Sequence, residues 1–193
     1  MTKRPLLAVF AVIVCASTVL SGCVPLVIAG AAGGTALVVA DRRSVGAQAD
    51  DEAIELKIVN NIGATYADTV HVNATSYNGV VLLTGEVPTP EIKTSIVQVA
   101  RNTPKVREVD DELVVGANSS IGARTNDSYI TSKVKARFVE ENKFPANNVK
   151  VVTERQVVYL MGLVRHVESD AAVQIARTTS GVVRVVKLFE YID

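Results

Sequence analysis

The stretch Asn78-Gly79-Val80-Val81-Leu82-Leu83-Thr84-Gly85 decides how the middle of this chain folds. Asn-Gly between two apolar segments is a strong signal for the two-residue turn of a β-hairpin. Residues 70–76 before the turn alternate apolar and polar side chains, which is typical of a half-buried strand. The apolar run after the turn predicts a buried strand. Gly85 then indicates a bulge or a close approach of a helix to the sheet.

A helix is predicted on each side of this hairpin. Upstream, within residues 51–62, isoleucines recur at every fourth position and form one helical stripe. They are Ile54, Ile58 and Ile62. Downstream, Thr89-Pro90 supplies an N-cap and a first-turn proline for a helix with an apolar face along residues 92–100. A last strand is expected at about 106–115, so the unit is helix-strand-strand-helix-strand.

The same order of elements recurs after a short joint rich in small residues. We expect Asn126-Asp127 to cap a helix with Ile130, Val134 and Phe138 on one stripe. The elements that follow are strands at 149–152 and 157–164, a helix at 167–178 and a strand at 183–192. Gly162 takes the place that Gly85 has in the first copy. The sequence therefore predicts an α+β protein with two tandem modules, at residues 50–115 and 126–193, joined by a linker at 116–125.

The beginning of the chain has the layout of a secretory signal peptide. Lys3 and Arg4 form a basic head, an uncharged apolar run follows, and Leu20-Ser21-Gly22-Cys23 ends it. The last four residues resemble the bacterial lipobox. That resemblance implies removal of residues 1–22 and acylation of Cys23, with palmitate among the acyl chains. An ordinary signal peptide or a transmembrane helix that happens to contain a cysteine is the alternative. We expect residues 23–49 to form a flexible tether near the membrane surface.

Residue Val24 bears on the destination of such a lipoprotein. In enterobacterial lipoproteins an Asp after the acylated Cys retains the protein in the inner membrane, by the same resemblance. Val24 therefore favours the outer membrane, on its periplasmic face.

The sequence offers no catalytic or metal-binding motif. Cys15 would leave with the signal peptide and Cys23 would be acylated, which excludes a cysteine nucleophile and a cysteine-based metal site. Motifs of hydrolases, zinc proteases and phosphate-binding loops are absent from the sequence. His71 and His166 have no carboxylate at motif spacing, so we expect both to lie on the surface. We predict no enzyme activity, no cofactor and no metal.

Charge differs between the two modules. Residues 50–115 carry 5 basic and 11 acidic side chains, a net charge of −6. Residues 116–193 carry 11 basic and 8 acidic side chains, a net charge of +3. Such a difference indicates that the modules meet different partners.

One helical face of the second module suits a lipid surface. An aromatic ring and small or apolar side chains lie there among cations, as at the boundary between headgroups and acyl chains. This candidate site, which we call the lipid patch, comprises Tyr129, Ser132, Lys133, Ala136, Arg137 and Val139. The alternative is that Tyr129 packs between the modules and the cations form a solvated face.

The repeat resembles the BON domain, which has two helices and a three-stranded mixed sheet. Three segments carry the likeness besides the element order and the glycine that ends the second strand. They are 43–48 (Arg-Ser-Val-Gly-Ala-Gln), 126–131 (Asn-Asp-Ser-Tyr-Ile-Thr) and 157–164 (Val-Val-Tyr-Leu-Met-Gly-Leu-Val). Two copies behind a lipobox are similar to dual-BON outer-membrane lipoproteins. One departure is Tyr129, where a Trp is expected.

The resemblance implies a function as well as a fold. It implies binding of anionic phospholipids such as phosphatidylglycerol and cardiolipin, location at the division site and support of envelope integrity. The alternative is an adaptor whose acidic first module docks an envelope protein of outer-membrane assembly or division. No feature of the sequence points to nucleic acid.

Overall fold

The hairpin around Asn78-Gly79 is present in the computed structural model, which describes residues 41–193. Strands β1 (His71–Tyr77) and β2 (Val80–Val87) pair antiparallel across this turn. Both turn residues have positive φ, 52° and 78°, as the mirror-image hairpin turn requires. Strand β3 (Glu108–Val115) pairs parallel to β2, so the sheet has the order β1-β2-β3 and is mixed.

Two helices cover one face of this sheet. Helix α2 (Val45–Tyr66) buries the predicted isoleucine stripe, whose members are at most 5% exposed. A 3₁₀ turn at Ala67–Thr69 follows it. Helix α3 (Pro90–Arg101) begins as predicted, since the Thr89 side chain accepts a hydrogen bond from the N–H of Ile92. The two stripes meet Val81, Leu83 and other sheet residues in one hydrophobic core.

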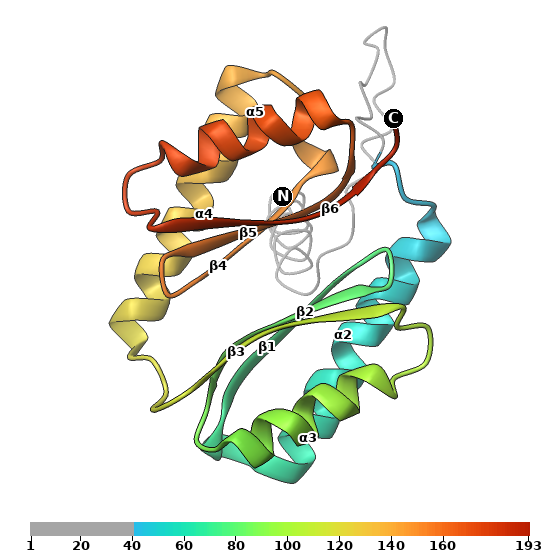
Figure 1. Ribbon diagram of the computed structural model, residues 1–193, viewed down its shortest axis with the longest axis vertical. Helices are drawn as coiled ribbons and strands as arrows, with labels where there is room; N and C mark the ends of the chain where they lie inside the picture. The colour runs from blue at the N-terminus through green and yellow to red at the C-terminus, as the bar shows by residue number, and fades with distance from the viewer. Residues whose placement is uncertain (1–40) are drawn as a thin grey trace, which may run out of the picture. The chain divides into compact units, whose positions relative to one another are not determined.

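The second module repeats this arrangement (Figure 1). Its elements are α4 (Ile121–Glu141), a 3₁₀ turn at Ala146–Asn148, β4 (Lys150–Glu154), β5 (Val157–Val164), α5 (His166–Arg177) and β6 (Arg184–Tyr191). The sheet order is β4-β5-β6, with β5 antiparallel to β4 and parallel to β6. The stripe predicted on its first helix is at most 1% exposed. The α+β class with two repeats is confirmed. We call α2 to β3 the first repeat and α4 to β6 the second repeat.

The first helix of each repeat begins earlier than predicted. Helix α2 starts at Val45, within the predicted tether, and α4 starts at Ile121, within the segment predicted as a linker. Ser44 and Ser120 cap them, each accepting from the N–H three residues on. The cap predicted at Asn126-Asp127 is therefore wrong, because these residues lie inside α4.

Asp127 serves the hairpin instead of the helix end. Its carboxylate accepts hydrogen bonds from both N–H groups of the β4–β5 turn, at 2.8 and 2.9 Å. Asp51 on α2 does the same for the β1–β2 turn, at 2.7 and 2.8 Å. Both carboxylates are buried. A short acidic side chain on the first helix thus fixes the hairpin turn in each repeat.

The two equivalent glycines allow a neighbouring backbone to come close. A Cβ at Gly85 would lie 1.9 Å from the carbonyl oxygen of His71, and one at Gly162 would lie 2.3 Å from that of Asn148. The close approach is as expected, but its source is not a helix. In both repeats, the close neighbour is the backbone at or just before the start of the adjacent antiparallel strand.

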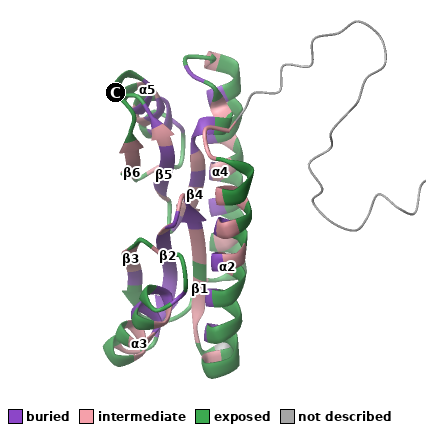
Figure 2. Ribbon diagram, turned by 90° about the vertical axis from the view of Figure 1, so that its right-hand side faces the viewer, coloured by how far each residue is buried: buried purple, intermediate pink, exposed green. Residues whose placement is uncertain are grey.

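The sheets of the two repeats pack against each other through their helix-free faces (Figures 1 and 2). A third hydrophobic cluster joins them, with Tyr77 and Leu82 from the first repeat and Tyr159 and Met161 from the second. All four side chains are at most 4% exposed. The described residues accordingly belong to one compact unit, with a core inside each repeat and one between them.

The start of the described chain is tied to both repeats. Arg42 forms a two-pronged ion pair with Glu168 at 2.6 and 2.8 Å, and donates to the carbonyl of Leu163. Arg43 pairs with Asp51 at 2.8 Å. The structure differs here from the flexible tether predicted for 23–49, because residues 41–49 carry these contacts and the first turn of α2.

The predicted signal peptide and residues 23–40, with Cys23, lie outside the described residues. In the part of the chain that is described, no helix has the length and apolarity needed to cross a membrane.

Candidate functional site

The outer face of α4 presents much of the lipid patch to solvent. Because Ile130, Val134 and Phe138 fix the buried side of the helix, residues roughly 140–220° further round the helix must face outward. Tyr129 is 62% exposed and Val139 is 68% exposed. Ser132 and Ala136 lie exposed between them. The alternative in which Tyr129 packs between the modules is wrong, since the tyrosines found there are Tyr77 and Tyr159.

Lys133 lies at the edge of this face. Its ammonium is 4.7 Å from the centre of the Tyr129 ring, within range of a cation–π interaction. The same group donates to the carbonyl of Ser180 in the loop after α5. Lys133 therefore orients the ring and ties α4 to the rest of the second repeat.

Arg137 is engaged inside the repeat. Its guanidinium donates to the carbonyl of Ile175 at 2.9 Å and to the hydroxyls of Thr178 and Thr179 at 2.9 and 3.0 Å. It also pairs with Glu141 at 2.6 Å. These contacts hold α4 to the end of α5, so Arg137 presents less charge to a ligand than the sequence indicated.

Two further features of this face were not predicted. Glu140 is exposed four residues after Ala136, so an acid lies within the same helical face. Beyond Val139, a shallow depression of about 510 Å³ continues the apolar surface. Phe138, Phe144 and Pro145 contribute to its lining, with the half-exposed Lys143 beside them. The helical spacing in the sequence shows the apolar positions along α4. It does not show that Phe144 and Pro145, beyond the turn that ends the helix, continue this surface.

The equivalent face of α2 has a different character. Ala53 stands where α4 has Tyr129. Leu56 is 63% exposed and Val59 is 46% exposed, next to Glu52 and Glu55. Apolar surface is therefore available on the first repeat too, but among acids.

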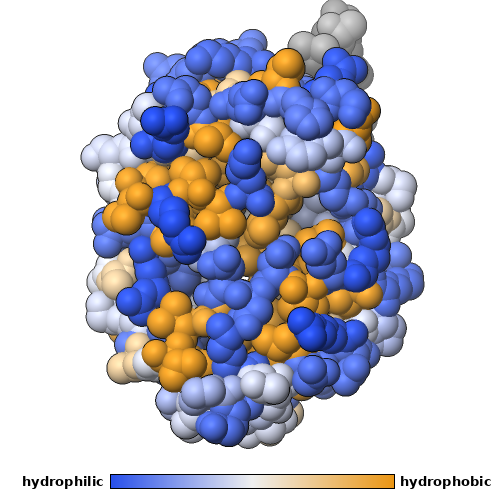
Figure 3. Space-filling model, in the orientation of Figure 1, coloured by the Kyte–Doolittle hydropathy of each residue, from blue (hydrophilic) through white to orange (hydrophobic). Residues whose placement is uncertain are grey.

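A second apolar surface lies away from α2 and α4, beside the strands β3 and β6. Figure 3 shows the face that carries β3 and β6, where hydrophobic side chains gather in patches among hydrophilic ones. On β3, Val114 is 39% exposed and Val115 is 45% exposed.

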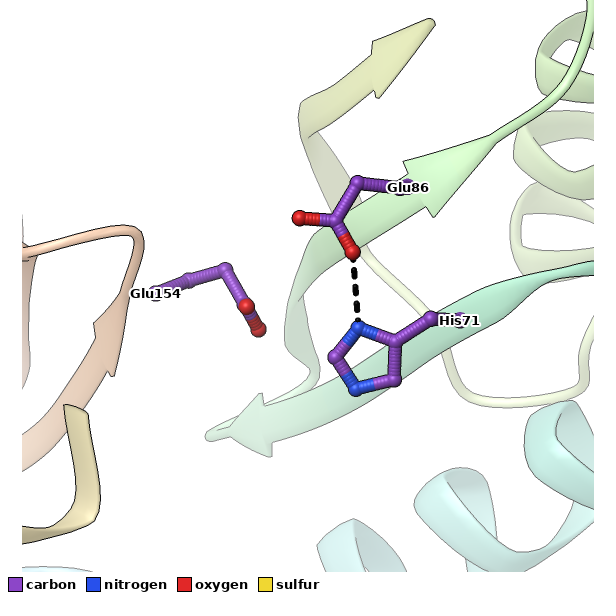
Figure 4. Close-up of side chains that lie close together, drawn as sticks. All are labelled: His71, Glu86 and Glu154. Atoms are coloured by element: carbon purple, nitrogen blue, oxygen red, sulfur yellow. Dashed lines mark hydrogen bonds and ion pairs between the residues drawn. The ribbon is translucent and has the colours of Figure 1, made fainter. Parts of the chain in front are cut away.

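The prediction that both histidines lie on the surface holds only in part for His71, whose side chain is 15% exposed. Its Nδ1 is 2.9 Å from Oε2 of the fully buried Glu86 on β2. Glu154, at the end of β4, faces this pair from the other repeat (Figure 4). Since 15 and 83 residues separate the carboxylates from His71, no motif spacing could have revealed the cluster.

The two carboxyl groups differ in their electrostatics. Burial opposes ionisation of Glu86, but hydrogen bonds from His71 and Ser119 outweigh it and lower the pKa of Glu86. Burial raises the pKa of Glu154, and the hydrogen bond from Asn73 does not reverse that effect.

His166 is exposed, as predicted, and its carboxylate partner lies 27 residues away in the sequence. Its Nδ1 lies 2.7 Å from Asp193, and its ring stacks on Tyr191 with 4.0 Å between ring centres.

Comparison with known proteins agrees with this architecture. The BON domain model matches residues 50–117 and 126–193. The chain is 38% identical over its full length, and that of the relative, to the "Outer membrane lipoprotein DolP" of Haemophilus influenzae. It is 34% identical to the "21 kDa hemolysin" of Actinobacillus pleuropneumoniae, over 79% of this chain and 80% of that one. It is 32% identical to "Osmotically-inducible protein Y" of Escherichia coli, over 72% and 71%. The chain belongs to the BON-domain family, as a member with two BON domains.

Proposed function

We propose that this chain is a non-enzymatic outer-membrane lipoprotein that faces the periplasm and binds anionic phospholipids through the lipid patch on α4. Phosphatidylglycerol and cardiolipin are the lipids it takes, and its role is support of envelope integrity at the division site. Full-length similarity to an outer membrane lipoprotein supports the location. The observation that carries the lipid proposal is the exposure of Tyr129 and Val139 on a helix of the basic repeat.

The contacts define how such a patch would work. The Tyr129 ring and Val139 enter the boundary between headgroups and acyl chains, where an amphipathic aromatic is favoured. Lys133 beside the ring and the exposed Lys135 face lipid phosphates. Each cation contributes on the order of 1 kcal/mol at an anionic surface. Arg137 positions α4 rather than binding lipid, because its donors are used within the repeat.

Weak binding by the patch is sufficient in a protein that is already held at a membrane. An acyl anchor on Cys23 would confine the folded unit to the surface, so that lipid contact by α4 becomes an intramolecular event at high effective concentration. The patch then orients the protein instead of recruiting it.

Vesicle binding by residues 41–193, which lack the anchor, tests the lipid site. We expect binding to phosphatidylglycerol vesicles, little binding to phosphatidylcholine, and weakening in high salt. Tyr129→Glu removes the apolar contact and adds a repelled charge, so we expect at least about a tenfold loss, roughly 1.4 kcal/mol. The matched control is Ala53→Glu, at the equivalent position of α2, which should change little. If folded Tyr129→Glu protein bound like the parent, α4 would not be the lipid site.

The anchor has a separate test. Cys23→Ala should leave the protein without acylation and absent from the outer-membrane fraction, because Cys15 is removed with the signal peptide. Mass spectrometry of the mature N-terminus checks this. An unmodified Cys23 in the parent would contradict the lipoprotein assignment.

A specific observation favours a second function. Leu56 and Val59 are exposed among acids on α2, and an anionic membrane would repel that surface. It suits an envelope protein with a basic, apolar face. In this adaptor hypothesis Leu56→Ser abolishes partner capture while vesicle binding stays unchanged. If Leu56→Ser lost both partner capture and vesicle binding, the two repeats would not have separate functions.

A further inference from the structure

Three potential metal ligands from distant parts of the sequence meet where the two repeats join. His71 comes from β1, Glu86 from β2 and Glu154 from β4 (Figure 4). One ligand atom from each lies within 4.8 Å of the others. The His71 side chain is 15% exposed, and Glu86 and Glu154 are buried.

We propose that His71, Glu86 and Glu154 form a binding site for a divalent first-row transition-metal cation such as zinc. Imidazole nitrogen and carboxylate oxygen are ligands that zinc takes at about 2.0–2.2 Å. Two such ligands in a tetrahedron are about 3.3 Å apart. Nδ1 of His71 and Oε2 of Glu86 are 2.9 Å apart, near that spacing, and a cation would replace the hydrogen bond between them.

An unsatisfied atom points to the same conclusion. Glu86 is fully buried, and its Oε1 has no hydrogen-bond partner. Figure 4 shows this second carboxylate oxygen on the side toward Glu154. A buried carboxylate oxygen without a hydrogen bond is costly unless a cation meets it. The guanidinium of Arg155 forms an ion pair with this oxygen at 3.6 Å, which is too long for a hydrogen bond.

The carboxylates are held in place as metal ligands usually are. Ser119 donates its N–H to Oε2 of Glu86 at 3.1 Å. Asn73 donates to Oε2 of Glu154 at 3.0 Å. Hydrogen bonds of this kind fix the orientation of ligating groups and contribute to affinity.

The surroundings permit entry of a cation. His71 and Glu154 line a surface depression of about 440 Å³, together with Asp127 and Arg124. Arg124 donates to the Ser119 hydroxyl at 3.1 Å, and Arg155 pairs with Glu86. Three carboxylates and two guanidinium groups thus lie in or beside this depression, so their summed charge is negative and favours a divalent cation.

Such a site would connect the two repeats. Two of its ligands belong to the first repeat and the third belongs to the second. Bound metal would add a coordinate link to an interface that otherwise combines a hydrophobic cluster with hydrogen bonds and ion pairs.

Zinc titration of the full chain, purified in detergent, tests the proposal. We expect one zinc ion bound per chain, a melting temperature that rises with zinc, and X-ray absorption with only nitrogen and oxygen neighbours. Glu154→Gln keeps the shape of the side chain but removes a ligand. It should weaken zinc binding by more than the roughly 10–100-fold that loss of an outer partner costs, and Asn73→Ala should fall within that range.

The matched control is His166→Ala, since His166 has one carboxylate neighbour, Asp193, rather than two. It should leave the affinity unchanged, and both cysteines are the same in every variant. His71→Ala removes a second ligand and should also weaken zinc binding. If that variant fails to fold, Glu154→Gln and the absorption spectrum of the parent still decide. No stoichiometric zinc, sulfur neighbours, or equal affinity in the parent and Glu154→Gln would overturn the proposal.

Discussion

Helices α2 and α4 occupy equivalent places in the two repeats, yet only their buried sides are alike. Each buries a stripe of large apolar residues and one aspartate that holds the hairpin turn. Their outer sides differ in aromatic content and in charge: Ala53 and Glu52 on α2 stand where α4 has Tyr129 and Ser128. Packing constrains the inner side because a core tolerates few changes of volume or polarity. The outer side is free to diverge, so different functions in the two repeats are expected to lie there.

The largest expected effect tests the similarity of the buried sides. Ile58→Asp on α2 and Val134→Asp on α4 each place a charge at a site with no solvent exposure. An unpaired buried charge costs several kcal/mol, so each variant should lose most of its stability. Circular dichroism and thermal melting measure this. The control is Val59→Asp, one residue from Ile58 and 46% exposed, which should melt near the parent.

A smaller effect separates the two aspartates. Removing either carboxylate leaves two turn N–H groups without a partner, which costs about 1–3 kcal/mol. Asp51→Ala should cost more than Asp127→Ala, because Asp51 also accepts from the Ser76 hydroxyl and pairs with Arg43. Denaturant titration gives the free energy of unfolding of both. Equal losses would show that the additional partners of Asp51 contribute nothing.

The lowered pKa of Asp51 predicts that the stability of the fold depends on pH. Burial disfavours its charge, but hydrogen bonds from Ser76, Gly79, Asn78 and Arg43 outweigh burial and lower its pKa. A carboxyl with a lower pKa in the folded state stabilises the fold above its unfolded pKa, near 4. That contribution is lost as pH falls through the folded value. The stability difference between the parent and Asp51→Ala should therefore be largest at neutral pH and shrink below about pH 4.

The smallest effect concerns one cation on each outer side. Lys133→Ala should weaken binding to phosphatidylglycerol vesicles by about 1 kcal/mol at low salt, and by less at high salt. Lys57→Ala, at the equivalent position of α2, should have almost no effect since acids surround it. Co-sedimentation at two salt concentrations measures both. A larger effect from Lys57→Ala would move the lipid site to the first repeat.

Much of the fold could be predicted because its signals are local. The Asn78-Gly79 turn, the stripe with Ile58 and the Thr89-Pro90 start each depend on residues within a few positions of one another. The start of α4 was missed because Asn126-Asp127 is a good cap by composition, while Asp127 is held by a turn 28 residues away. Ser120 is the cap in the structure, and residue type alone does not choose between Ser, Asn and Asp, which are all favoured at this position.

In the candidate site, too, local patterns predict some features, and other features depend on residues far apart in the sequence. Exposure of Tyr129 and Val139 followed from helical period. The engagement of Arg137 could not be predicted, because its partners at 175–179 lie about 40 residues away. The cluster of His71 with Glu86 and Glu154 depends on how one sheet packs on the other, which no local pattern encodes.

The arginines at the start of the described chain have a mechanical consequence. A pull transmitted along the backbone to Asp41 reaches Arg42 and Arg43 before it reaches the first turn of α2. Arg42 passes load to Glu168 in the second repeat, and Arg43 passes load to Asp51 in the first. The force is therefore shared between the repeats at their junction, instead of peeling one helix from its end.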